Sequence, residues 1–566
     1  MTWSEDWVSP TDLRNWMRED PLLDWLGLFG EANGFQKGRQ DVDTSLSAFL
    51  WSKGRDFERR VVDFIRAKCE VVEVEPEYDE NRNRLWWAEL EKTKHLIGDG
   101  PEVIYQATVA DEDGLFYGRP DLLVRTDALP RIVGCSPDLE VDHRHYVVVD
   151  IKYSSGKLKK KTQTFVNDKH KLSQALIYNQ CLAAMQGFPL RYAYLLFRSI
   201  KDCETSDGCF ARLAPVDTHF QELNQSVTAG ANWIRRLRDD GANWSVLPSP
   251  SVEELRPNMG NTQDEPWHDA KKQIGEQLRD LTQLWYVTPN NRPRGIAVGV
   301  TRWDDDECCA SLFGLTEDRT EVLQAIIDVQ KPDAPSVSPE RIATARDEWH
   351  PKAKLEFFVD FETVSNLDDD FSTFPVIGGT PLIFMIGCGY EKDDEWKFDC
   401  FIVDRLSAQS EAEIITKWVD HMARICTEYG VSDPRVFHWS PAEQSSLTTS
   451  FQSARNRHPE ENWPEPNWFD FLNAVVKKEP VVVKGAFAFG LKAFANALYS
   501  HDLIRTHWTS SRIDGLGAMV GAWNCEHKCT DGGCLMDFEL MKEIRDYNEI
   551  DCKVMWEAVN YLRANH

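Results

Sequence analysis

The N-terminal part of the chain alternates between helical and strand-like hydrophobic spacing. Residues 54–70 repeat apolar positions at the period of an amphipathic helix, and residues 170–186 predict a second helix. Short runs rich in β-branched and aromatic residues at 115–126, 145–155 and 191–198 predict strands. We therefore expect a mixed sheet flanked by helices, which is an α/β arrangement.

The C-terminal part begins with strands and ends with helices. Strands are predicted at residues 355–364, 381–391, 396–404 and 436–439, and helices at residues 412–430 and 539–564. This order also predicts an α/β or α+β domain.

Two stretches rich in Pro, Ser and polar residues, 243–266 and 330–351, have the composition of joints. They predict three domains at residues 1–245, 246–345 and 346–566. The middle one shows helical periods at 274–287 and 320–330 and no group of residues that demands chemistry. We expect a multidomain α/β chain whose middle module connects the other two, in keeping with its 566 residues.

Composition narrows the class of protein. The chain is 42% hydrophobic and 28% charged, as in globular proteins, and it has no apolar run long enough to span a membrane. The acidic, polar start and the scattered cysteines predict an intracellular, cytoplasmic protein, with the nucleus as an alternative and no membrane partner.

The formal net charge of −28 opposes binding to a polyanion, but one stretch is strongly basic. It covers residues 156–171 and includes Lys157, Lys159, Lys160 and Lys161. These lysines are candidate DNA-binding residues, and a solvated charged loop is the alternative.

A first acidic group follows two predicted strands. Asp121 begins the strand after a Gly-Arg-Pro turn, and Asp150 and Lys152 flank Ile151 on one face of another strand. Two carboxylates on adjacent strands can hold Mg²⁺ or Mn²⁺, and a lysine can orient or deprotonate the attacking water. A buried Asp–Lys salt bridge is the structural alternative.

Helical residues extend this group. Glu58 lies on the preceding amphipathic helix and would supply a third carboxylate, although alone it would be an ordinary surface residue. Gln174 and Tyr178 are spaced i, i+4 and share one helix face, so both can reach a strand-end site.

Together, Glu58, the GRPD turn, the DIK strand end and the Gln-x-x-x-Tyr pair resemble the RecB family of PD-(D/E)XK nucleases over residues 9 to 200. The resemblance implies a restriction-endonuclease-like fold acting on DNA, often at single-stranded ends. It also implies Glu58, Asp121 and Asp150 as metal ligands, Lys152 as the catalytic lysine, and Gln174 with Tyr178 positioning DNA. Many relatives carry an iron–sulfur cluster; no cysteine precedes Cys69 here, so we expect none.

A second acidic group lies in the C-terminal part. Asp360 and Glu362 are spaced i, i+2 on a hydrophobic strand, so both emerge from one face. Tyr547 and Asp551 are spaced i, i+4 on a helix and face one pocket.

These residues resemble the RNase H-like DEDD exonucleases of the tyrosine subgroup, over residues 355 to 563. The resemblance implies Asp360, Glu362 and Asp551 as ligands of two divalent metals, Tyr547 orienting the nucleophilic water, and removal of nucleotides from 3′ ends. The remaining carboxylate of the pattern has two candidates, Glu443 and Asp470. An RNase H-like fold kept for binding or assembly is the alternative.

A cysteine-rich loop holds four potential soft ligands, Cys525, His527, Cys529 and Cys534. They could close a structural zinc site, although their spacing is irregular for one. Scattered thiols of a surface insertion are the alternative.

The sequence thus predicts a metal-dependent nuclease with two active sites, working in DNA repair or in defence against foreign DNA. One alternative is a nucleic-acid-binding adaptor with one or both sites degenerate, serving a helicase or a defence complex. No Walker A motif is present, so any motor must be a partner. RNA is the alternative substrate for the C-terminal site.

Overall fold

The computed structural model describes residues 5–38, 43–134, 145–201, 203, 205–440, 447–509 and 513–566. The chain forms two compact units. Unit 1 comprises Met1–Arg39, Leu50–Leu278 and Asp369–Gly379, and unit 2 comprises Gln40–Phe49, Arg279–Asp368 and Thr380–His566.

The predicted middle module, residues 246–345, is divided between the two units. Trp267 and Ile274 belong to a hydrophobic core of unit 1, whereas Leu281 and Leu323 belong to the core of unit 2. The two halves of the segment bury their apolar faces in different cores, so this stretch is not a separate body.

The helices and strands of unit 1 follow the sequence prediction closely at its centre, where α3, β6, α6 and β7 occur. Its helices are α1 (Arg14–Met17), α2 (Leu22–Trp25), α3 (Leu46–Arg66), α4 (Trp86–Asp99), α5 (Leu129–Ile132), α6 (Lys169–Gln186), α7 (Gln221–Asp240) and α8 (His268–Leu278). Its strands are β1 (Val71–Glu73), β2 (Val103–Tyr105), β3 (Val109–Asp111), β4 (Phe116–Gly118), β5 (Leu122–Arg125), β6 (Tyr146–Gly156), β7 (Tyr192–Ile200) and β8 (Ala214–Asp217). Short 3₁₀ or π turns are η1 (Leu26–Gly30), η2 (Glu31–Asn33), η3 (Gly208–Phe210), η4 (Gly241–Asn243) and η5 (Glu253–Leu255).

Unit 1 is built on a mixed six-stranded sheet in the order β1-β2-β5-β6-β7-β8. The β1–β2 and β6–β7 pairs are parallel and the other pairs are antiparallel. The run at 115–126 forms two strands, because the Gly-Arg-Pro turn separates β4 from β5. The predicted mixed sheet is confirmed.

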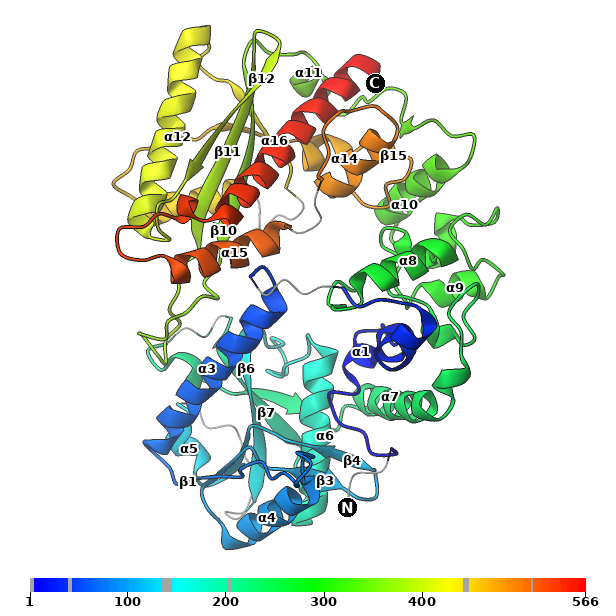
Figure 1. Cartoon of the computed structure of the whole chain (residues 1–566), viewed down its shortest axis with the longest axis vertical. Coiled ribbons are helices and arrows are strands. Elements are labelled where there is room, and N and C mark those ends of the chain that lie inside the picture. The colour runs from blue at the N-terminus through cyan, green and yellow to red at the C-terminus, as the bar shows by residue number, and fades with distance from the viewer. Residues whose placement is uncertain are drawn as a thin grey trace. The chain divides into compact units, whose positions relative to one another are not determined.

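Alternate residues of these strands face opposite helices. Val147 and Val149 pack in one core with Phe57 of α3, whereas Tyr146 and Val148 pack in another core with Leu176 of α6. Figure 1 shows α3 and α6 on either side of β6 and β7. Asp150 and Lys152 continue the series of Val148, so the period of two directs them toward α6.

Unit 1 also includes residues 369–379, which lie far along the chain. Phe371 stacks on Phe57 with ring centroids 6.1 Å apart, and Asp369 forms a buried ion pair with Arg198 at 3.4 Å. This segment therefore contributes to the core of unit 1 although strands of unit 2 flank it in sequence.

Unit 2 contains the remaining elements. Its helices are α9 (Arg292–Ile296), α10 (Glu317–Gln330), α11 (Arg346–Trp349), α12 (Ala408–Tyr429), α13 (Leu447–Arg457), α14 (Leu491–Ser500), α15 (Gly515–Lys528) and α16 (Glu539–Asn565). Its strands are β9 (Val337–Ser338), β10 (Glu356–Val364), β11 (Leu382–Lys392), β12 (Glu395–Ile402), β13 (Arg435–His438), β14 (Asn467–Asp470) and β15 (Val482–Val483). Short turns are η6 (Leu281–Gln283), η7 (Ala310–Phe313), η9 (Leu472–Val476) and η10 (Leu535–Asp537).

The main sheet of unit 2 has five strands in the order β12-β11-β10-β13-β14. β12, β11 and β10 are antiparallel, and β10, β13 and β14 are parallel. Each of the strands and helices predicted here from hydrophobic pattern is present, so this unit is also mixed α/β.

The period of two along β10 separates its apolar and acidic side chains. Phe361 contacts Trp418 of α12 with ring centroids 5.5 Å apart, while Asp360 accepts a hydrogen bond from Asn548 of α16. Figure 1 shows α12 and α16 on opposite sides of the sheet. The carboxylates of β10 therefore emerge on the face that α16 covers.

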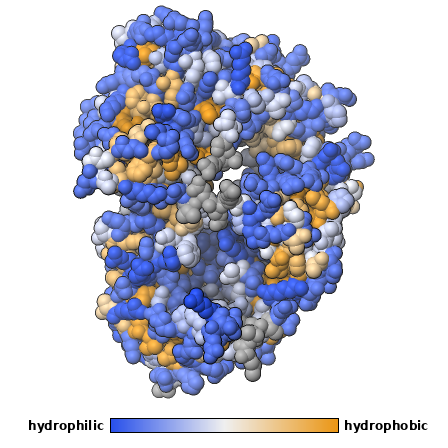
Figure 2. All heavy atoms as spheres, in the orientation of Figure 1, coloured by the Kyte–Doolittle hydropathy of each residue, from blue (hydrophilic) through white to orange (hydrophobic). Residues whose placement is uncertain are grey.

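Figure 2 shows mostly hydrophilic residues on the face in view, with hydrophobic residues in smaller patches. Within the described residues, none of the helices combines the length and apolarity that a membrane crossing requires.

Candidate active sites

Three carboxylates meet on the α16 face of the unit 2 sheet. One oxygen from each of Asp360, Glu362 and Asp551 lies within 4.8 Å of the others, and no other such group of metal-ligand side chains occurs among the described residues. Asp360 and Glu362 arrive together because they are two residues apart on β10, and Asp551 is supplied by α16. The sequence-predicted triad is thus brought together.

Two neighbours hold these carboxylates in place. Asn548 Nδ2 donates to Asp360 Oδ2 at 2.9 Å, and Trp508 Nε1 donates to Asp551 Oδ1 at 2.8 Å. Gly387 of β11 pairs directly with Asp360, and a β-carbon there would overlap the amide of Asn548. The glycine is required at this position because the amide approaches the backbone so closely.

The carboxylates strongly influence one another's ionisation. Burial raises the pKa of Asp360 to about 7, and burial together with the charges of Asp360 and Asp551 raises the pKa of Glu362 well above its usual range. Burial and then Asp360 likewise raise the pKa of Asp551. Glu362 is buried and Asp360 and Asp551 are half-buried. Three carboxylates so close together favour a bound cation, because like charges in a site of low dielectric constant repel strongly.

Tyr547 and Lys492 border this cluster. Burial, followed by the charge of Asp551, raises the pKa of Tyr547, so its hydroxyl keeps its proton at neutral pH. Lys492 Nζ lies 5.7 Å from the Tyr547 ring centroid and 5.9 Å from that of Trp508, and its charge favours ionised Asp551. The site therefore has a protonated phenol and one cation beside its carboxylates.

The sequence offers two candidates for a further carboxylate of this site, Asp470 and Glu443, and the structure describes only Asp470. Asp470 ends β14, two strands away from β10, and accepts hydrogen bonds from Asn473 N at 3.1 Å and Asn473 Nδ2 at 2.7 Å. It is not a member of the three-carboxylate cluster. Glu443 lies outside the described residues.

The first predicted site lies in unit 1, where β5 begins beside the middle of β6. Ile151 N donates to Asp121 Oδ2 at 2.7 Å, which joins the two strands at the Asp121 carboxylate. Gln106 Nε2 donates to Glu58 Oε1 at 2.5 Å and to Asp121 Oδ1 at 3.3 Å. The amide thus lies between the two predicted ligands, so Glu58, Asp121 and Asp150 are near one another but are not gathered as tightly as the unit 2 triad.

Lys152 joins the remaining residues of this site. Its Nζ forms an ion pair with Asp150, which is almost fully buried, and donates to Gln174 Oε1 at 2.8 Å. Gln174 Nε2 in turn donates to Tyr178 Oη at 3.0 Å. The structure therefore contains the Asp–Lys ion pair, and it also connects that pair to the predicted glutamine and tyrosine.

Burial and neighbouring charges also shift the pKa values of two residues in this site, Asp121 and Lys152. Burial, then the charges of Asp150 and Glu58, raise the pKa of Asp121 well above its usual range. For Lys152, burial is the largest influence and acts downward, but the charges of Asp150 and Asp121 outweigh it and raise the pKa. The ammonium therefore stays charged among the carboxylates at neutral pH.

Two residues of the GRPD turn, Gly118 and Arg119, have a structural role. Arg119 Nε donates to the carbonyl of Gln106 and its Nη2 to the carbonyl of Val74, both at 2.9 Å, which braces the turn before Asp121. A β-carbon at Gly118 would overlap the ring of Tyr178. The turn therefore sets Asp121 and leaves space for the Tyr178 side chain.

Gln106, Lys492, Trp508 and Asn548 were not predicted from sequence. Gln106 has φ of 56°, a conformation that non-glycine residues seldom adopt, so its amide is held at the site against local strain. Asn548 adjoins Tyr547 in the RDYNEID motif, and this was the one available signal for it. The other three lie far in sequence from the motif residues they touch.

The remaining predicted residues are not gathered into a site. Lys157, Lys159, Lys160 and Lys161 follow β6 and are exposed. Among Cys525, His527, Cys529 and Cys534, the imidazole Nε2 of His527 pairs with Asp368 at 2.8 Å and Cys534 Sγ donates to Asp404 Oδ1 at 3.4 Å. These four do not bring three ligand atoms within 4.8 Å of one another, and all four are described. The zinc prediction has no geometric support.

Comparison with known proteins adds no family assignment. No family model matches the chain, and no curated protein matches it either. The interpretation therefore rests on the residues and geometry of the two sites.

Proposed function

We propose that the chain is a metal-dependent nuclease that hydrolyses phosphodiester bonds of DNA, with one active site in each unit. The observation that carries this proposal is the cluster of Asp360, Glu362 and Asp551, flanked by Tyr547. Hard oxygen ligands of this kind suit Mg²⁺ or Mn²⁺. The mixed sheet under the cluster is compatible with an RNase H-like exonuclease domain, and the unit 1 sheet with a RecB-like one.

In unit 2, Asp360, Glu362 and Asp551 would hold the cation, which would supply a Lewis acid and an acidified water for attack on phosphorus. Asn548 and Trp508 fix the orientation of two of the carboxylates through hydrogen bonds. The protonated hydroxyl of Tyr547 can donate to a water or to a phosphate oxygen. Lys492 supplies positive charge beside the ring of Tyr547.

In unit 1, Glu58, Asp121 and Asp150 are the proposed metal ligands. The charged Lys152 lies against Asp150, where it can orient the attacking water or stabilise the charge that develops on the phosphate. Gln174 accepts a hydrogen bond from Lys152 and donates one to Tyr178, and both Gln174 and Tyr178 would contact the nucleic-acid strand. DNA repair or defence against foreign DNA is the proposed setting.

The test is cleavage of end-labelled single- and double-stranded DNA and RNA, in Mn²⁺ or in EDTA. The variants are Asp150→Asn, Asp360→Asn and the double variant, with Asp394→Asn as a control because Asp394 is exposed in the turn after β11. We expect each single variant to remove a different set of products and the control to cut like the wild type. If the wild type binds these substrates and cuts none with any metal, the adaptor function replaces the nuclease; if only RNA is cut, the substrate assignment is wrong.

A further inference from the structure

One cationic side chain beside the unit 1 site has a buried donor with no acceptor. Arg18 Nη1 is buried and, within the described part of the chain, has no hydrogen-bond partner. Burial and then the neighbouring charge of Arg14 lower the pKa of Arg18 to about 10, so the guanidinium is charged at neutral pH. A buried charged donor without an acceptor is costly, and a bound anion would remove that cost.

The surroundings of Arg18 carry an excess of positive charge. Arg14 is one helical turn earlier and exposed, and α1 packs on α6. The charge of Asp168 acts on Arg18, but this carboxylate accepts from His170 N and Lys171 N at 3.1 Å and from Lys171 Nζ at 2.7 Å. The hydrogen bonds that Asp168 accepts thus come from the start of α6, and none of them comes from Arg18.

His170 connects this region to Lys152. Burial, then the charges of Lys152 and Arg18, lower the pKa of His170 to about 4, so its imidazole is neutral at physiological pH. The charge of Asp168 also contributes to raising the pKa of Lys152. His170 and Gln174 are four residues apart on α6, and Gln174 Oε1 accepts from Lys152 Nζ at 2.8 Å, so the start of α6 lies beside the Lys152 end of the unit 1 site.

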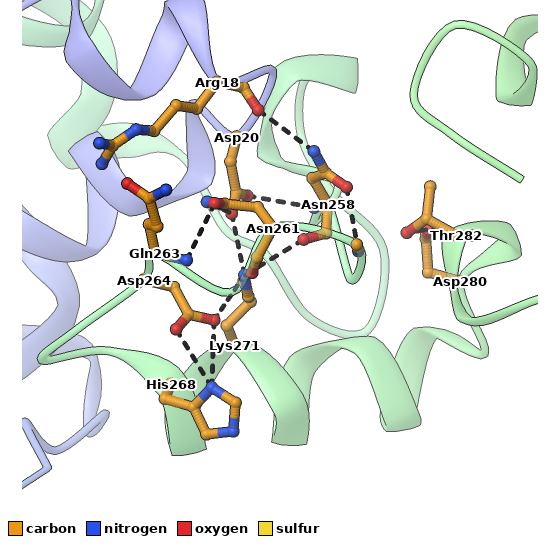
Figure 3. Close-up of polar contacts among 11 residues, drawn as sticks. Arg18, Asp20, Asn258, Asn261, Gln263, Asp264, His268, Lys271, Asp280 and Thr282 are labelled. Atoms are coloured by element: carbon orange, nitrogen blue, oxygen red, sulfur yellow. Dashed lines mark hydrogen bonds and ion pairs between the residues drawn. The ribbon is translucent and has the colours of Figure 1, made fainter. Parts of the chain in front are cut away.

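The backbone of Arg18 is held from the opposite side, as Figure 3 shows. Asn258 Nδ2 donates to the carbonyl of Arg18 at 3.2 Å, and Asp20 accepts from the buried Lys271 Nζ at 3.0 Å. In Figure 3 the guanidinium of Arg18 extends away from Asp20, Asn258 and Lys271, on the side where Gln263 is drawn, and no dashed line reaches it. The network fixes the segment while leaving the guanidinium uninvolved, which suits a preorganised ligand contact.

We propose that Arg18 is a binding subsite for a backbone phosphate of the nucleic-acid strand cut at the unit 1 site. This inference rests on the proposed function and extends it. In a chain with a net charge of −28, affinity for a polyanion depends on such local cations.

The experiment is equilibrium binding of an end-labelled single-stranded oligothymidylate in EDTA, followed by fluorescence anisotropy over a range of salt concentrations. For Arg18→Gln we expect about tenfold weaker binding and a salt dependence reduced by about one phosphate contact. Arg14→Gln makes the same charge change four residues earlier, at the start of α1, and should weaken binding much less. The melting temperature of Arg18→Gln should stay near that of the wild type, because Nη1 bonds to nothing in the protein.

Equal losses in the two variants would overturn the subsite, because they would indicate only long-range attraction. A large drop in melting temperature with unchanged binding would also overturn it, in favour of a structural role. If inorganic phosphate binds at Arg18 while the oligonucleotide does not, the ligand is a small phosphorylated molecule and the proposal is wrong.

Cleavage separates this inference from the proposed function. If the wild type cuts DNA in a way that needs Asp150, and Arg18→Gln binds and cuts equally well, the subsite alone is wrong. If the wild type neither binds nor cuts any nucleic acid, both the function and the subsite are wrong.

Discussion

The indole Nε1 of Trp508 donates a hydrogen bond to the carboxylate of Asp551 at 2.8 Å. Asp551 belongs to the three-carboxylate cluster, so Trp508 orients a proposed metal ligand without being one itself. Partners of this kind usually matter for metal affinity nearly as much as the ligands do.

We therefore expect Trp508→Phe to weaken Mn²⁺ binding at the unit 2 site by about tenfold or more, since the carboxylate loses the donor that orients it. The measurement is a Mn²⁺ titration of thermal stability and of unit 2 cleavage. Trp439→Phe is the matched control, because Trp439 donates to the carbonyl of Phe489 at 3.0 Å and is not in the cluster. Equal effects of the two substitutions would contradict the orienting role.

Substitutions of Gln106 can separate the backbone strain at this residue from its contribution to cleavage at the unit 1 site. Both Gln106→Ala and Gln106→Gly remove the amide that bridges Glu58 and Asp121, so both should lose unit 1 cleavage. Only alanine keeps a side chain at φ of 56°, so the glycine variant should be more stable by about 1 kcal/mol. Chemical denaturation and cleavage assays check the two effects; full activity in either variant would show that the bridge is dispensable.

The sequence was most informative where the regular period of a strand or helix places residues together. Asp360 and Glu362 share a face because strands repeat every two residues, and Asp551 reaches them from α16. Asp150 and Lys152 follow the same rule on β6.

What failed to emerge from sequence depends on contacts between distant segments. Trp508 and Lys492 reach the cluster through tertiary packing, which no local pattern encodes. The division of residues 246–345 follows from which core each apolar face enters, and residues 369–379 join unit 1 through Phe371 and Phe374. Proline-rich composition indicated irregular structure at the joints, but it carries no information about core membership.

Gly118 provides a test of the close approach of Tyr178. Gly118→Ala places a β-carbon in overlap with the tyrosine ring, so we expect a destabilisation of about 1–3 kcal/mol and reduced unit 1 cleavage. Gly98→Ala in α4 is the matched control, because its β-carbon would meet nothing within 4 Å and should stabilise the helix by up to about 1 kcal/mol. Unchanged stability and cleavage in Gly118→Ala would show that the ring moves without cost.

Asp24 predicts a pH dependence of unit 1 stability. Burial raises its pKa from 3.8 to about 7, although Trp233 Nε1 and Asn15 Nδ2 donate to it at 3.0 and 2.7 Å. The folded state therefore holds the proton more tightly than the unfolded state, and the Asp24 contribution to stability falls as pH rises between those two values. Above the folded pKa that loss is complete.

The difference in free energy of unfolding between Asp24→Asn and the wild type isolates this contribution. The asparagine amide of the variant changes the free energy of unfolding by an amount that does not depend on pH, because an amide cannot ionise. Between pH 3.8 and about 7, the stability of the variant relative to the wild type should therefore rise by about 1 kcal/mol per pH unit. Denaturation at a series of pH values measures the slope. A difference that does not change with pH would mean that Asp24 ionises normally in the folded protein.

Lys271 is the centre of the buried network in Figure 3, and its loss should be severe. Its ammonium contacts Asp20 at 3.0 Å and Asp264 at 2.6 Å, and all three side chains are almost fully buried. Burial raises the pKa of Asp20 despite the opposing charge of Lys271, whereas hydrogen bonds from His268 and Lys271 overcome burial and lower the pKa of Asp264. Lys271 is therefore the buried basic partner of these two carboxyl groups.

Lys271→Met should destabilise unit 1 by about 3–5 kcal/mol, because it leaves buried carboxyl groups without their cation. Lys272→Met, at the exposed neighbouring position, should change stability by less than about 1 kcal/mol. Adding Asp20→Asn to Lys271→Met should recover part of the loss, since one carboxylate is then neutral. Denaturation of the full chain, followed by tryptophan fluorescence, measures all three variants; a neutral Lys271→Met would mean that the carboxyl groups hold protons in the native protein and that the ion-pair description is wrong.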